Sequence, residues 1–287
     1  MHTSPEALIA QTTDLVSLPH IYLRVKAVME DPETSMADLT AVVSHDPALI
    51  ARLLKLANSA FFGFTTKIDT IDRAVNLLGA QQIHDLVLAT TVADAFSKMS
   101  PHTITMHDFW TGSIHCGLLA KSFGSACGLF DAERFFVEGL LYDLGHLILD
   151  QCVPEACAAA FARAHEEARP VHLVEREMIG CDYAQVGAAL MESWSFPGGF
   201  VEAVRWQNEP AEATAFALEA AVMHTSIAML RADRTELDCE AVFAMLDPSA
   251  VEVTGATADI LSGVRTEAAE ALTETVELLF PQARLCA

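Results

Sequence analysis

Residues 44–60 of the chain read SHDPALIARLLKLANSA, and this stretch decides the fold class. Its apolar residues recur at helical spacing and occupy so much of the circumference that the helix is expected to be largely buried. Asp46 and Pro47 form a helix start signal, because aspartate caps free amide groups and proline fits the first turn. Asn58 is expected to form the turn at the other end, so a helix is predicted from Pro47 to about Ala57.

The rest of the chain repeats this helical pattern, without the sustained two-residue alternation that is typical of strands. Ser35 begins a capping-box variant, and Gly79 and Gly128 are expected to end helices. Further helices are predicted over His107 to Ala126, Asp131 to about Asp150, from Pro154, Pro170, Asp182 and Pro197, and over Thr214 to Leu230 and Ala258 to Leu279. The sequence therefore predicts an all-α, multi-helical protein.

Composition excludes several classes of function. The 287-residue chain has 17 basic and 39 acidic residues, a net charge of -22. Because such a surface repels a phosphate backbone, we expect no direct nucleic-acid binding. The seven cysteines include no C-x-x-C pair, which is typical of reduced thiols. With neither a secretory signal pattern nor an apolar run near the ~20 residues of a membrane span, a cytoplasmic location without membrane contact is expected.

Residues 135–149 read FFVEGLLYDLGHLIL and place one carboxylate, Asp143, in an apolar helical stretch. An isolated buried carboxylate is costly, so Asp143 must be paired, hydrogen-bonded, metal-bound or protonated. His146 lies three residues on and shares its helical face. Two interpretations stay open: a structural Asp–His contact, which we favour, and a metal site with His146 as a second ligand.

Several ordered stretches resemble the HDOD (HD-related output) domain family. They are residues 44–60, residues 68–79 (IDTIDRAVNLLG), Phe109-Trp110, residues 139–145 (GLLYDLG) and residues 194–197 (WSFP). The resemblance covers about residues 15 to 210. It implies an HD-domain-like helical bundle over 1–210, with an N-terminal helical part to about 100 and an HD-like core over 101–210. Residues 211–287 are expected to form an acidic helical extension packed on that core.

HDOD domains are similar to the HD and HD-GYP phosphohydrolases, whose two-metal sites use histidines and aspartates on several helices. A two-metal site polarises phosphate and generates hydroxide, and it needs several anionic or imidazole ligands. Among the ligand positions that the resemblance implies, only Asp143 keeps the expected type. The others are Gly112, Tyr142, Tyr183, Gln207, Asn208 and Thr225. With Asp143 and His146 they are expected to form a vestigial HD-site pocket without a catalytic residue, a metal or another cofactor.

The resemblance implies a regulatory role, as an output or adaptor module linked to a bacterial two-component response-regulator pathway. We therefore predict a non-catalytic pseudo-enzyme that acts through a signalling protein partner or a small ligand in the vestigial pocket. The alternative is a divergent metal-dependent phosphohydrolase or phosphodiesterase. It requires a relocated metal site, for which the candidate ligands are His115, Asp143, His146 and His224. Trp110, Trp194 and Trp206 are expected to line the former site or its roof.

Overall fold

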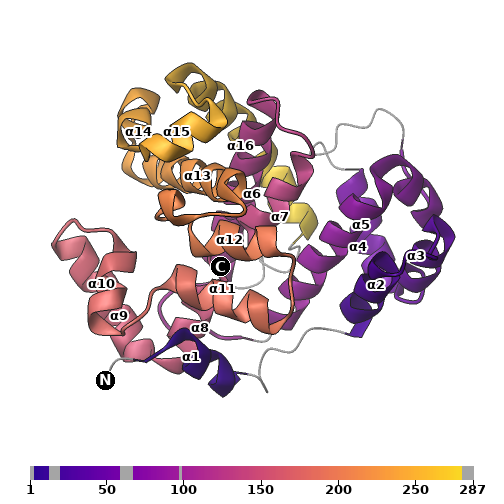
Figure 1. Ribbon diagram of the computed structural model, residues 1–287, viewed down its shortest axis with the longest axis horizontal. Coiled ribbons are helices and arrows are strands. Elements are labelled where there is room, and N and C mark those ends of the chain that lie inside the picture. Colours follow the sequence, from indigo (N-terminus) through magenta and orange to yellow (C-terminus); the bar gives the residue numbers. More distant parts are fainter. Residues whose placement is uncertain (1–2, 13–19, 59–66, 97–98, 280–287) are drawn as a thin grey trace. The chain divides into compact units, whose positions relative to one another are not determined.

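The computed structural model describes residues 3–12, 20–58, 67–96 and 99–279 (Figure 1). Within these ranges the regular elements are all helices and no strand occurs, which confirms the predicted all-α fold class. None of these helices is both long and apolar enough to cross a membrane. The chain divides into two compact units: the small unit, residues 16–99 and 270–287, and the large unit, residues 1–15 and 100–269.

The small unit contains the helices whose start and stop signals are clearest in the sequence. The side chain of Ser35 forms the predicted capping box with Asp38, and the carboxylate of Asp46 accepts the amides of two residues in the first turn of α4. At Gly79 a φ of 84° interrupts helical geometry within α5, as predicted. The helices of this unit before residue 100 are α2 (His20–Glu30), α3 (Met36–Val43), α4 (Pro47–Ala57) and α5 (Ile71–Phe96).

Asn58 joins the end of α4 to the residues that precede α5. Its side-chain Nδ2 donates to the carbonyl oxygens of Leu54 and Ile68, both at 2.6 Å. Its Oδ1 accepts the backbone N–H of Ile68, also at 2.6 Å. The predicted turn former therefore also makes a contact ten residues away.

The large unit contains the remaining helices, and the signals at Pro154, Pro170, Asp182 and Pro197 each precede or begin one of them. The predicted boundary near residue 210 stays a prediction; α13, which follows it, packs on α6 and α12 within the large unit. The helices are α1 (Pro5–Thr12), α6 (Met106–Ala126), α7 (Glu133–Leu141), α8 (Leu144–Cys152), α9 (Pro154–Glu166), α10 (Val171–Met178), α11 (Tyr183–Ser193), α12 (Gly198–Arg205), α13 (Ala217–Thr235), α14 (Cys239–Met245) and α15 (Pro248–Thr254), with a 3-10 turn at Pro210–Glu212. The last helix, α16 (Ala258–Leu279), begins in the large unit, and its residues from 270 onward belong to the small unit.

One predicted helix is wrong in its extent. The stretch from Asp131 to Asp150 is not continuous: α7 ends at Leu141, Tyr142 and Asp143 form a turn, and α8 begins at Leu144. A long-range contact accompanies this break. A Cβ placed on Gly145 would lie 1.8 Å from the carbonyl oxygen of Tyr183, so the backbone of α8 rests directly on α11. Local apolar spacing does not encode that contact, and Asp143 consequently lies at the start of α8 instead of inside a helix.

The same kind of close approach joins α6 to α7. A Cβ on Gly139 would lie 2.5 Å from the Cα of Gly117, so the two helices touch at backbone level. Real Cβ atoms essentially never approach this closely, so both positions require glycine. This packing brings α6 beside the turn that carries Asp143, while α13 packs across α6.

Candidate functional site

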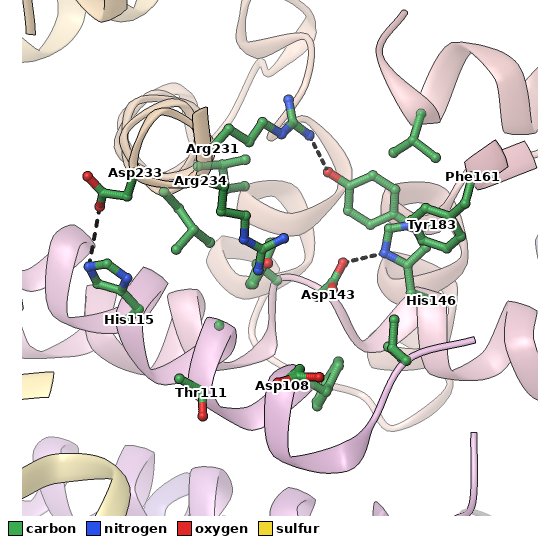
Figure 2. Close-up of a pocket in the computed structure, with 17 residues that line it drawn as sticks. Asp108, Thr111, His115, Asp143, His146, Phe161, Tyr183, Arg231, Asp233 and Arg234 are labelled. Carbon is green, nitrogen blue, oxygen red and sulfur yellow. Dashed lines mark hydrogen bonds and ion pairs between the residues drawn. The ribbon is translucent and has the colours of Figure 1, made fainter. Parts of the chain in front are cut away.

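A cavity of about 520 Å³ lies in the large unit, between α6, the turn from α7 to α8, α11 and α13 (Figure 2). Its floor carries Asp143 and His146, and α13 supplies two further lining residues, Arg231 and Arg234. Apolar side chains also line the cavity. Its polar or charged lining residues are Asp108, Thr111, His115, Tyr142, Asp143, His146, Tyr183, Arg231, Asp233 and Arg234.

The floor is organised around His146. Its Nδ1 lies 2.5 Å from an oxygen of Asp143, and its Nε2 lies 2.9 Å from an oxygen of Glu175 on α10. The second oxygen of Glu175 accepts the backbone N–H of Tyr183 at 3.0 Å. His146 is therefore the hydrogen-bond partner that the sequence predicted for Asp143, and the imidazole bridges two carboxylates.

The bridge keeps His146 protonated. Burial alone lowers the pKa of this imidazole, but the charges of Asp143 and Glu175 outweigh burial and raise the pKa to about 10. The ring of Tyr183 stacks on the imidazole with 4.1 Å between centroids and 11° between planes, which favours a cationic ring. Both ring nitrogens of His146 are engaged by carboxylates, so in this arrangement neither of them is free to coordinate a metal ion.

Above Gly112 lies a guanidinium group. A Cβ built on this glycine would lie 3.0 Å from Nη2 of Arg234 and 3.9 Å from the hydroxyl of Tyr142. The space that a side chain at position 112 would need is thus occupied by a cation from α13. Burial, reinforced by Asp143, raises the pKa of Tyr142 well above its ordinary value, so this phenol stays neutral.

The other predicted pocket residues are divided between the cavity wall and the layer behind it. Tyr183 lines the cavity, and its hydroxyl donates to Oδ1 of Asn208, which also accepts from Arg231. Gln207 is buried behind the wall and donates to the backbone carbonyl of Tyr142 at 3.0 Å. Thr225 is fully buried and donates to the carbonyl oxygen one turn earlier in α13, so it does not face the cavity.

The four residues of the relocated metal site do not form one ligand set: Asp143 and His146 are in contact and His115 lines the same cavity, but His115 and His224 have other partners. His115 lies beside Asp233, with 3.5 Å between their nearest side-chain atoms. Both ring nitrogens of His224 are used by backbone groups: Nδ1 donates to the carbonyl of Gln207, and Nε2 accepts the N–H of Asp247, each at 3.1 Å. Across the parts of the chain that the structure describes, no group of three or more His, Cys, Asp or Glu side chains is placed to hold a metal ion.

The donor set therefore does not fit the two metal ions that the resemblance to HD phosphohydrolases implies. Such a site needs several anionic or imidazole ligands. The positions instead present a glycine, neutral phenols, amides and a buried hydroxyl, and a guanidinium approaches from α13.

Sequence reasoning missed three contributors to this site, Glu175, Arg231 and Arg234. Glu175 follows the apolar Val174 on the buried side of α10, and a carboxylate at such a position is a detectable signal. The two arginines are three residues apart and so share a face of α13. Their approach to the cavity depends on how α13 packs, which no local pattern reveals. None of the three tryptophans lines the cavity, so that expectation is wrong; Trp206 lines a separate hollow beside α12.

Comparison with known proteins identifies relatives. A curated, uncharacterized protein from Treponema pallidum is 27% identical over 197 residues, which are 68% of this chain and 38% of the relative. The chain therefore spans well under half of that protein. The crystal structure of a candidate phosphohydrolase from Shewanella amazonensis is similar with a TM-score of 0.73 and 25% identity, over 95% of this chain and 96% of that one.

A second crystal structure, of an HDOD domain protein with unknown function from Geobacter sulfurreducens, has a TM-score of 0.72 and 20% identity, and covers 96% of this chain and 98% of that one. The HDOD domain family matches residues 15–210. These are the limits that the sequence motifs suggested, and membership fits a regulatory role. The chain belongs to the HDOD domain family.

Proposed function

We propose that this chain is a non-catalytic regulatory module, an HDOD-type output or adaptor protein that acts by binding a signalling protein or a small ligand. The observation that carries the proposal is the hydrogen-bonded pairing of Asp143 with His146. This carboxylate, the aspartate of the HD position, is bound by a protonated His146, which is bound in turn by the buried Glu175. An aspartate held in this way is neutralised by the protein itself and has a structural role.

The residues that stand at the expected metal-ligand positions support the same proposal. Metal ions repel a nearby fixed cation, and the guanidinium of Arg234 lies over Gly112, where the resemblance expects a histidine ligand. Recovering an HD-type metal site would thus require both new ligands and removal of this cation. Because this chain has a net charge of -22, we expect its partner to be a protein or a small molecule and not a nucleic acid.

The competing hypothesis is a divergent metal-dependent phosphohydrolase. It is favoured by the similarity to the candidate phosphohydrolase from Shewanella amazonensis. Under this hypothesis the purified protein carries stoichiometric transition metal and hydrolyses phosphodiesters or nucleotides. That activity would depend on Asp143.

The experiment measures metal content by elemental analysis and hydrolysis of phosphodiester and nucleotide substrates with added Mn²⁺ or Fe²⁺. Asp143→Asn is compared with Asp72→Asn, which changes an exposed aspartate of α5. We expect no stoichiometric metal and no turnover by the wild type or by either variant. Bound metal together with turnover that Asp143→Asn abolishes and Asp72→Asn preserves would overturn the proposal.

Partner binding is tested separately, by affinity capture from extracts of the source organism with and without a chelator. A regulatory module should retain a specific protein in both conditions. A partner retained only when metal is present would count against non-catalytic binding. So would the absence of both a protein partner and a small ligand.

A further inference from the structure

Two arginines of the large unit differ from all the others. The described residues of this unit include eight arginines, and six pair with a carboxylate: Arg134, Arg163, Arg169, Arg176, Arg205 and Arg265. Within the described residues Arg231 donates only to the neutral side chains of Tyr183 and Asn208, both at 3.1 Å. Arg234 makes no hydrogen bond or ion pair with any residue in the described part of the chain. Both side chains are exposed, so solvent reaches these two guanidinium groups, and within the described residues neither is neutralised by contact with a carboxylate.

Both unpaired guanidinium groups line the same cavity (Figure 2). The acidic residues there have other partners: Asp143 binds His146, and Asp233 pairs with Arg265 and lies beside His115. Asp108 accepts from Thr105 at the start of α6 and is the remaining acidic lining residue. The positive charge of the two arginines therefore faces the cavity without being neutralised by contacts within it.

The remaining lining is apolar. Ile104, Phe109, Phe161, Val171, Ile227 and Leu230 contribute side chains to it. A volume of about 520 Å³ lies within the range of small-molecule sites, and this cavity combines apolar side chains with a larger number of polar and charged ones. The cavity thus suits a compact ligand with an apolar or aromatic body and an anionic group.

Guanidinium geometry favours phosphate as that group. Each guanidinium presents a planar fork of donors, which matches two oxygens of one anion. A phosphate has enough oxygens to engage both arginines at once. A carboxylate can also bridge two arginines, as Glu177 does between Arg163 and Arg169, so it is the third oxygen and the greater negative charge of a phosphate that favour it.

We propose that this cavity binds a phosphorylated small molecule of nucleotide type, with its phosphate on Arg231 and Arg234 and its apolar body against the aromatic wall. The inference rests on the proposed function, since it treats the HD-site pocket as a receptor and not as a catalytic centre. Gly112 contributes to it, because a side chain at this position would crowd the guanidinium of Arg234.

The test is isothermal titration calorimetry of the full chain with AMP, GMP and cyclic di-GMP, beside adenosine, guanosine, inorganic phosphate and citrate. At least one phosphorylated probe should bind, at least tenfold more tightly than its nucleoside, since a lost charge-assisted hydrogen bond is equivalent to about tenfold or more in affinity. Arg231→Gln and Arg234→Gln should each weaken that binding by about tenfold or more. Arg24→Gln removes the same charge from an exposed site in the small unit and should leave affinity unchanged.

Failure is readily recognised. The inference is overturned if no phosphorylated probe binds at about 1 mM, if nucleosides or citrate bind as tightly, or if both cavity variants bind like the wild type. Because Arg231 and Arg234 are exposed, their variants should fold, which circular dichroism checks. Absence of ligand binding with protein-partner capture intact refutes only this inference. Hydrolysis of a bound probe, with binding lost in the arginine variants, instead supports the site and refutes the proposed lack of catalysis.

Discussion

Replacing His146 with glutamine removes the cation between Asp143 and Glu175. The imidazole is 6% exposed and Glu175 is fully buried, so solvent cannot replace the lost interaction. Glu175 would keep the N–H of Tyr183 but lose its charged partner at 2.9 Å. Removing one partner of a buried ion pair costs about 3–5 kcal/mol, and we expect His146→Gln to lower the free energy of unfolding by this amount near neutral pH.

The pH dependence distinguishes this mechanism from a simple packing defect. The pKa of His146 is about 10 in the folded protein and 6.5 in the reference state, so folding retains a proton that the unfolded chain releases. The stabilisation is fully present below about pH 6.5 and is lost as the pH rises through about 10. Linkage then predicts that the wild type loses roughly 2–3 kcal/mol between about pH 7 and about pH 9 that His146→Gln does not lose.

Urea unfolding followed by far-UV circular dichroism at the two pH values measures this difference directly. Titrating groups that do not contact His146 contribute equally to the wild type and the variant, so they cancel when the two pH dependences are subtracted. His107→Gln, an exposed position at the start of α6, is the matched control and should behave like the wild type. A stability difference that is the same at both pH values, or smaller than about 1 kcal/mol, would refute the bridging role of His146.

Two predictions concern the packing and the loop connection. Gly145→Ala should lower the free energy of unfolding by about 3 kcal/mol or more, because the new Cβ would lie 1.8 Å from the carbonyl oxygen of Tyr183. The control, Gly263→Ala, places a Cβ in open space on α16 and should be neutral or stabilise the protein by up to about 1 kcal/mol. Equal effects of the two substitutions would contradict the close contact at Gly145. Asn58→Ala should cost about 1–3 kcal/mol by leaving the backbone groups of Ile68 without partners, and thermal unfolding that is unchanged would disprove this connection.

The sequence alone determined those parts of the structure that depend on neighbours a few residues away. The caps at Asp46 and Asp182 form because each side chain bonds to amides within its own first turn. The all-α class follows from apolar periodicity that recurs along the chain. The Asp143–His146 contact was also predictable, since the two residues are three apart and keep that relation although the helix does not extend across the turn.

Tertiary structure decided the chemical character of the site. Glu175 is 29 residues from His146, and it adds to the effect of Asp143 on the imidazole only because the tertiary fold brings α10 within hydrogen-bonding distance of that ring. The break at Tyr142 and Asp143 accompanies the contact of Gly145 with α11, and the approach of Arg234 to Gly112 requires α13 to lie across α6. A sequence records which groups are present, but burial and distance set their pKa values and their partners, and these exist only after distant helices have packed.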